Sequence, residues 1–308
     1  MLREGSVVSV AERVLHLRAR PELEQVPVGD LAPLAAAGRE VSYSSRTVLV
    51  PRGEPAPAAY VALSGRMRAL RDGSPLPGDP VVKAFGAYAL FGGAVFDADI
   101  VAEPGALLLV LDADVVREAL EDAPSLLRSL LRGFAGNILR DRAQGDAREP
   151  RTPVTEPPPG WLQSPDLAER MFLLQQALQL GPGGLTVLGQ LARAAEVRAD
   201  GLDRELWSPG TPVGEVRLVL GGTLQILPGP TGGWTAERGH FLGLVEVLAE
   251  SPWQHRARVT LPSTSLVIPA SEVAAVLEDH FQLGLEVLRR LARESWLRRT
   301  GTLALEVS

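Results

Sequence analysis

The sequence predicts a mainly β protein with flanking helices, built as two tandem domains of the same plan. Three observations support this prediction. The chain contains one glycine-bracketed stretch twice, short apolar runs separated by turn residues fill the middle of each half, and helical periodicity frames those runs on both sides. Many short strands at such spacing are typical of an antiparallel sandwich or barrel.

The repeated stretch runs from Gly53 to Gly65 and again from Gly210 to Gly222, so the two copies are 157 residues apart. Two further islands of similarity, later in each half, keep the same offset, which indicates a duplicated domain. Each copy predicts strand, tight turn, strand, with the second glycine where the turn needs a positive φ. An ordinary antiparallel hairpin is the alternative interpretation of one copy alone.

Composition limits the class of protein. A length of 308 residues agrees with two domains, and the net charge of −6 gives no general attraction to nucleic acid or to anionic membranes. The chain has no cysteine, which excludes disulfides, zinc–cysteine sites and thiol nucleophiles. Lys83 is the single lysine, a bias typical of a GC-rich bacterial genome. The sequence shows neither a signal peptide nor a membrane-spanning run, so we expect a cytoplasmic protein without membrane insertion.

In the first half, residues 7–37 predict short helices, with Ser6 and Asp30 as candidate N-caps. Two more helices are expected at the end of this half, one after Asp112 and one beginning at Pro124, where proline suits a helix start. Between these helical parts, apolar runs of strand length occur at 48–50, 60–63, 67–70, 81–85, 88–91, 99–102 and 106–111.

A proline-rich segment, 146–160, is the predicted linker, and it separates domain 1 (1–145) from domain 2 (161–308). A proline-rich docking peptide is the competing interpretation of this segment. Domain 2 repeats the plan, with helices expected at 167–180 and 185–195, strands from 196 to 268, and helices at 271–278 and 280–298.

This order of elements, together with Gly53-Glu54, Tyr60 and Gly65 at the strand turn, resembles the cyclic-nucleotide-binding domain. The chain looks like two such domains in tandem, the arrangement of protein kinase A regulatory subunits, and each is also similar to the sensor domain of Crp/Fnr-like regulators. The resemblance covers nearly the whole chain. It implies two jelly-roll domains of the double-stranded β-helix type.

In that family a short cassette between two strands holds the ligand. A Phe-Gly-Glu turn aims backbone N–H groups at the cyclic phosphate, and the glutamate accepts a hydrogen bond from the ribose hydroxyl. An arginine in a Pro-Arg-Ala-Ala segment pairs with the phosphate. The ligand expected from the resemblance is cyclic AMP or cyclic GMP.

In domain 1, Phe91-Gly92-Gly93 aligns with the Phe-Gly-Glu turn, so Gly93 replaces the glutamate. No basic residue lies between Gly92 and Arg117, and the segment from Gly92 to Val110 spans 18 residues, against 24 for its counterpart in domain 2. A shortened, acidic cassette repels a phosphate. The resemblance therefore implies that domain 1 does not bind nucleotide.

In domain 2, Gly243 aligns with the glycine of the turn, and Glu246 lies two residues beyond the glutamate position, which Leu244 occupies. Under the functional interpretation, His255, Arg256 or Arg258 holds an anion. The favoured interpretation is that Arg256 and Arg258 are solvated sheet arginines. The ligand-binding candidates of domain 2 are therefore Gly243, Leu244, Glu246, His255, Arg256 and Ala257.

No catalytic motif is present: the sequence lacks a Gly-x-Ser-x-Gly elbow, a P-loop and a Rossmann glycine pattern, so we predict a non-enzymatic protein without a cofactor. His240 and His255 could be imagined as metal ligands, but the spacing of cupin ligands is absent, so no metal is expected. Trp234 is expected at an exposed hairpin tip, and the other tryptophans in the core or at its rim.

The leading hypothesis is a regulatory or adaptor protein that acts by binding another protein, with nucleotide binding lost in domain 1 and doubtful in domain 2. The alternative is a cyclic-nucleotide sensor that binds in domain 2 and moves the 280–299 helix. Helices 124–143 and 280–299 are expected either to form a homodimer or to cover their own barrels. No nucleic-acid partner is expected, since neither domain is followed by a helix-turn-helix.

Overall fold

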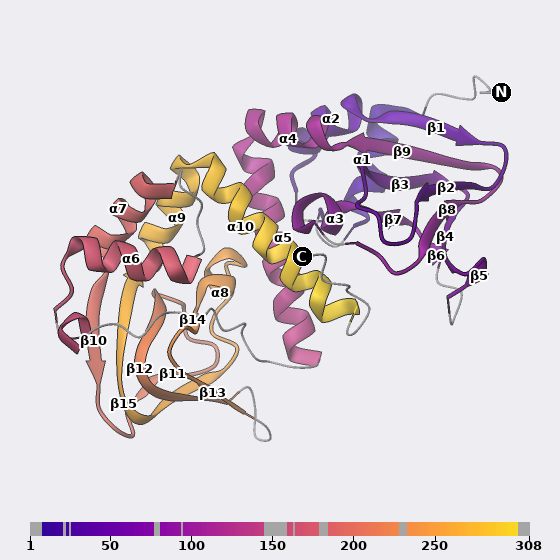
Figure 1. Ribbon diagram of the computed structural model, residues 1–308. Coiled ribbons are helices and arrows are strands. Elements are labelled where there is room, and N and C mark those ends of the chain that lie inside the picture. Colours follow the sequence, from indigo (N-terminus) through magenta and orange to yellow (C-terminus); the bar gives the residue numbers. More distant parts are fainter. Residues whose placement is uncertain are drawn as a thin grey trace. The chain divides into compact units, whose positions relative to one another are not determined.

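The computed structural model divides the chain into two compact units (Figure 1). Unit 1 comprises Met1–Asn137 and Val287–Ser308, and unit 2 comprises Ile138–Glu286. The structure describes residues 8–20, 23–24, 26–76, 81–93, 95–144, 159–162, 164–178, 184–227 and 233–300.

This division differs from the predicted domains 1–145 and 161–308. Two long helices, α5 (Pro124–Gln144) and α10 (Phe281–Thr300), contribute residues to both units. Unit 1 therefore receives its last helical segment from the end of the chain, and most of the predicted linker, 146–160, lies outside the described residues.

Unit 1 consists of two antiparallel sheets, ordered β1-β9-β3-β7 and β2-β8-β4-β5, with β6 paired to β4. The strands are β1 (Arg39–Tyr43), β2 (Thr47–Val50), β3 (Ala58–Ser64), β4 (Met67–Arg71), β5 (Ser74–Pro75), β6 (Val81–Val82), β7 (Ala84–Phe85), β8 (Asp99–Ala102) and β9 (Ala106–Asp112). Its other helices are α1 (Val10–Arg18), α2 (Val28–Ala37), α3 (Ala87–Gly92) and α4 (Ala113–Asp122).

Unit 2 has one antiparallel sheet system, β10-β15-β12-β13, with β11 paired to β15 and β14 to β12. Its strands are β10 (Glu196–Asp200), β11 (Glu205–Trp207), β12 (Glu215–Leu227), β13 (Trp234–Ala236), β14 (Phe241–Leu242) and β15 (Arg256–Pro269). The helices are η1 (Pro159–Leu162), α6 (Leu167–Leu178), α7 (Leu185–Ala194), α8 (Leu244–Leu248) and α9 (Ala270–Asp279). The predicted fold class, antiparallel β with flanking helices in duplicate, is confirmed.

The two long strands of unit 2 explain the repeated glycine. β12 corresponds to β3 and β4 of unit 1 joined end to end, and its register shifts between Val219 and Leu224. β3 pairs with β9 whereas β4 pairs with β8, so the stretch is not a hairpin. It is a corner at which one strand passes from one sheet to the other. The predicted tight turn is therefore wrong, although the positive φ is confirmed, at +70° for Gly65 and +76° for Gly222.

A close approach of two backbones at each corner also requires glycine. A Cβ at Gly65 would lie 2.7 Å from the Cα of Ala106, and a Cβ at Gly222 would lie 2.5 Å from the Cα of Ser263. Ala106 and Ser263 are themselves 157 residues apart. The duplication thus extends to the contact that fixes the corner.

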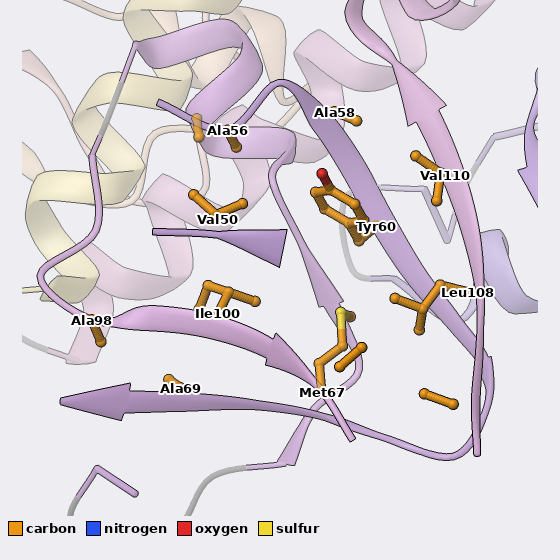
Figure 2. Close-up of a cluster of buried hydrophobic side chains, with 13 residues drawn as sticks. Val50, Ala56, Ala58, Tyr60, Met67, Ala69, Ala98, Ile100, Leu108 and Val110 are labelled. Atoms are coloured by element: carbon orange, nitrogen blue, oxygen red, sulfur yellow. The ribbon is translucent and has the colours of Figure 1, made fainter. Parts of the chain in front are cut away.

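Side chains from both sheets fill the interior of unit 1. Figure 2 shows Tyr60, Met67 and Ile100 pointing into the space between the strands. Several of the residues beside them are alanines, at positions 56, 58, 69, 98, 102 and 106. In unit 2 the equivalent cluster instead contains the large rings of Trp207, Trp234 and Trp253.

The first helices lie where the periodicity predicted them, but their N-caps differ from the predicted residues. Ser9 caps α1 through a capping box with Glu12, whereas the predicted cap, Ser6, lies outside the described residues. Asp30 lies inside α2, which begins after Pro27. The run 88–91, predicted as a strand, falls in helix α3. In the part of the chain that the structure describes, no helix has the length and apolar character needed to cross a membrane.

Candidate functional site

A glycine with a positive φ before a short helix identifies the cassette in each unit. Gly86 and Gly243 each precede a short helix, α3 and α8, with φ of +106° and +92°. A Cβ at Gly86 would lie 2.4 Å from the carbonyl oxygen of Ala58, and a Cβ at Gly243 would lie 2.9 Å from that of Glu215. Both pairs are separated by 157 residues, so Gly86 is the structural counterpart of Gly243.

This equivalence corrects the sequence alignment of domain 1, which assigned that role to Gly92 and Gly93. Measured from Gly86, the cassette reaches Val110 in 24 residues, the same length as its counterpart, so it is not shortened. Gly92 instead lies against α10, where an added Cβ would be 3.0 Å from the backbone nitrogen of Arg293. Gly93 ends α3 with a φ of +63°.

In unit 2 the cassette residues Leu244 and Glu246 lie on α8, and both are buried. Glu246 is 1% exposed. Its Oε1 lies 3.9 Å from Nη1 of Arg142 on α5 and 4.0 Å from Nδ1 of His255. The glutamate that the sequence offered to a ribose hydroxyl is therefore directed at a buried arginine and a buried histidine of the same unit.

His255 is neutral in this environment. Burial, with the positive charge of Arg142 as a second cause, lowers the pKa of His255 to about 4. The nearby carboxylate of Glu246 would favour the protonated form, but at 4.0 Å its effect is outweighed by the desolvation of the ring. A neutral imidazole brings no positive charge to a phosphate.

The arginines of β15 lie outside the buried cassette. The side chain of Arg256 is 53% exposed and lies 3.4 Å from Glu205, and that of Arg258 is 51% exposed and lies 3.0 Å from Asp203. Ala257 alternates with them and is buried in the interior. The strand therefore turns its alanine inward and both arginines outward, as the favoured interpretation of these arginines predicted.

Aromatic rings occupy the interior beside the cassette. Trp207 and Trp253 stack with ring centroids 4.0 Å apart and planes 11° apart, and His255 presents an edge to both. A Cβ at Gly243 would meet the Trp253 ring at 2.8 Å. Trp234 is 7% exposed, so the prediction of an exposed hairpin tip is wrong for that residue.

Unit 1 has no ionisable side chain at the positions equivalent to Glu246 and His255, which are Ala89 and Ala98. The acidic residues that follow are paired with arginines of the neighbouring strands. Asp97 contacts Arg52 at 2.5 Å and Arg71 at 2.9 Å. The positive charges of Arg52 and Arg71 are thus already matched by a carboxylate.

Sequence reasoning did not identify two buried charged groups. One is Arg142, whose position near the end of a predicted helix gave no sign of burial. The other is a network in which Arg217 bonds Asp200 at 2.5 Å and Glu215 at 2.8 Å. Burial raises the pKa of Glu215, but hydrogen bonds from Arg217 and Arg198 outweigh burial and hold it below its usual value. Arg217 occupies the position that corresponds to Tyr60 in the other copy. Aligning the two copies by sequence alone would have shown this difference.

The described residues include no group of three or more histidine, aspartate and glutamate side chains arranged to hold a metal ion. His240 instead places its Nδ1 2.9 Å from the carbonyl oxygen of Glu237 and lies beside the Trp234 ring.

No protein-family model and no curated protein matches the chain. Among solved structures, it is similar to the regulatory subunit of a cAMP-independent protein kinase A from Trypanosoma brucei, with 15% identity, a TM-score of 0.34 and coverage of 94% of this chain and 91% of that one. The guanosine-bound subunit from Trypanosoma cruzi gives 14% identity, a TM-score of 0.34 and coverage of 99% and 98%. The sensor domain of the transcriptional regulator DNR from Pseudomonas aeruginosa gives 18%, 0.35, and coverage of 42% and 99%. These proteins belong to the family that the sequence resembles. Because the identities and TM-scores are low, the function proposed below depends on the chain's own residues.

Proposed function

We propose that the chain is a non-enzymatic regulatory or adaptor protein, that it acts by binding another protein, and that neither unit binds a cyclic nucleotide. The observation that carries the proposal is that the polar groups of the unit 2 cassette already face one another inside the unit. There Glu246 faces Arg142, and the stacked rings of Trp207 and Trp253 occupy the adjoining interior.

Binding of a cyclic phosphate needs a positive charge or a set of donors directed at it. In unit 2, Arg142, a buried cation near the cassette, already faces a carboxylate, and the exposed Arg256 and Arg258 pair with acids on the surface. Opening the cassette would leave Glu246 buried without its cation and would separate the tryptophan stack. Both changes oppose ligand entry.

Unit 1 supports the same proposal by a different route. Its cassette has the full length and keeps its glycine, but Ala89 and Ala98 supply no acceptor for a ribose and no partner for a phosphate. Of the arginines of β4, Arg71 lies 2.9 Å from Asp97 and Arg68 lies 4.0 Å from Glu103. A protein that keeps two such frames without the polar groups of ligand binding is suited to present surfaces to a partner.

The first test is calorimetric titration of the purified chain with cyclic AMP, cyclic GMP and cyclic dinucleotides. We expect no heat of binding from any of them. Micromolar binding that is abolished by Arg256→Ala, and unaffected by Arg117→Ala on the exposed face of α4, would overturn the proposal and establish a sensor in unit 2.

The adaptor role needs its own test, because a negative titration does not demonstrate a partner. The tagged chain is isolated from its own cells after cross-linking, and co-purifying proteins are quantified by mass spectrometry. We expect one protein in a constant ratio to the chain, and the same complex re-formed from the two purified components. Failure of every co-purifying candidate to bind the purified chain would refute this part.

A further inference from the structure

Unit 1 also contains a cavity of about 320 Å³ between its helices and β3. Ala59 and Val61 line it from the sheet, Leu17 from α1 and Phe134 from α5. Tyr60 and Ala89, which belong to the cluster between the sheets, also line the cavity, so it adjoins that interior. It lies in the size range of small-ligand sites, at the lower end.

The lining is apolar with one charged exception. Among the described residues that line the cavity, Arg20 is the only one with an ionisable acid or base in its side chain other than Tyr60, and no carboxylate is present. Trp296 of α10 and Phe91 of α3 add large rings to the wall. Such a surface favours a hydrocarbon body and disfavours a sugar or a nucleobase, whose polar groups would find few partners.

The positive charge of Arg20 has no carboxylate beside it among the described residues that line the cavity. It directly follows the C-cap of α1, and its backbone N–H donates to the carbonyl of Leu17. Its Nε is buried and has no hydrogen-bond partner among the described residues. Withdrawing a guanidinium N–H from water without a partner is unfavourable, and a carboxylate is the group whose geometry best matches it.

We propose that unit 1 binds an aliphatic monocarboxylate of about the size of a medium-chain fatty acid, with its carboxylate at Arg20 and its hydrocarbon chain in the apolar cavity. One cation suits one negative charge, whereas a phosphate dianion would require further donors. The cavity shares Gly86 and Ala89 with the cassette of unit 1, but its ligand is not a cyclic nucleotide. The two proposals can therefore fail separately: decanoate binding tests this one, and titration with cyclic nucleotides tests the function proposed above.

The test is calorimetric titration of the full chain with decanoate, kept below the concentration at which it forms micelles, and with 1-decanol as the uncharged probe of the same chain length. We expect one decanoate per chain and binding of decanol weaker by at least about tenfold, since a hydrogen-bonded ion pair is lost. Arg20→Gln should weaken decanoate binding by a similar factor and leave decanol unchanged.

Two further variants separate the site from general effects. Ala59→Leu fills the cavity from the sheet side and should abolish binding of both probes, with circular dichroism confirming that the variant folds. Arg18→Gln, at the exposed last residue of α1, should bind like the wild type. The proposal is overturned if decanoate does not bind, if Arg20→Gln binds it as tightly as the wild type, or if decanol binds equally well.

Discussion

Substituting Gly86 by alanine tests the cassette equivalence most directly. Gly86 has a φ of +106°, and an added Cβ would lie 2.4 Å from the carbonyl oxygen of Ala58 and 2.8 Å from the Cα of Ala59. A left-handed conformation costs a residue with a Cβ about 1–2 kcal/mol. Displacing backbone in a packed region adds about 1–3 kcal/mol. We therefore expect Gly86→Ala to destabilise unit 1 by about 2–5 kcal/mol.

Gly93 supplies the matched control, since its φ is +63° but an added Cβ would meet nothing within 4 Å. Gly93→Ala should cost only the conformational part, about 1–2 kcal/mol. Urea unfolding gives the midpoints, and hydrogen exchange of peptides from β3 and α3 reports on unit 1 even where the two units unfold in separate steps. In unit 2, Gly243→Ala and Gly210→Ala form the corresponding pair. Equal shifts for Gly86→Ala and Gly93→Ala would refute the close contact with β3, and with it the assignment of Gly86 to the cassette.

Three further predictions concern buried charge. Because the pKa of His255 is lowered from 6.5 to about 4 on folding, the wild type should lose up to about 3 kcal/mol of stability as the pH falls from about 6.5 to 4, and His255→Gln should flatten that decline in urea titrations at each pH. Asp200→Asn removes the fully buried partner of an arginine and should destabilise unit 2 by about 3 kcal/mol, whereas Asp203→Asn, in an exposed pair, should cost less than about 1 kcal/mol; similar midpoints for the two would contradict this. Arg142→Met should cost about 3 kcal/mol because it removes the guanidinium that faces the buried carboxylate of Glu246, and adding Glu246→Gln should recover part of that loss; a strictly additive double mutant would show that the two side chains are not coupled.

The periodicity and the repeat predicted most of the fold. Pro124 begins α5 as expected, and the second glycine of each repeated stretch has the expected positive φ. The hairpin was wrong because a glycine between two strands is compatible with both a turn and a sheet-switching corner. Only the partners of β3 and β4 distinguish these, and pairing partners are distant in sequence.

The candidate site was less predictable, for two physical reasons. The alignment of Gly92 with Gly243 relied on one phenylalanine, although the constant offset of 157 already pointed to Gly86 without any gap. That signal was available in the sequence. The pairing of Arg142 with Glu246 was not, because it joins residues 104 positions apart and depends on the path of α5 beyond unit 1.

In the two copies, the backbone contacts that hold the fold are the same, whereas the side chains between them differ. The frame is kept by backbone contacts: the N–H of Gly53 donates to the carbonyl of Phe96 at 3.0 Å, and the N–H of Gly210 donates to that of Trp253 at 2.8 Å. These bonds place no demand on the side chain of the accepting residue. Between the same frames, Tyr60 is replaced by Arg217 and the small residues of one interior by the tryptophans of the other. Because neither exchange disturbs the glycines or their hydrogen bonds, the polar groups of a ligand site can be lost while the fold remains, which is the physical basis for proposing a scaffold role on a sensor-like architecture.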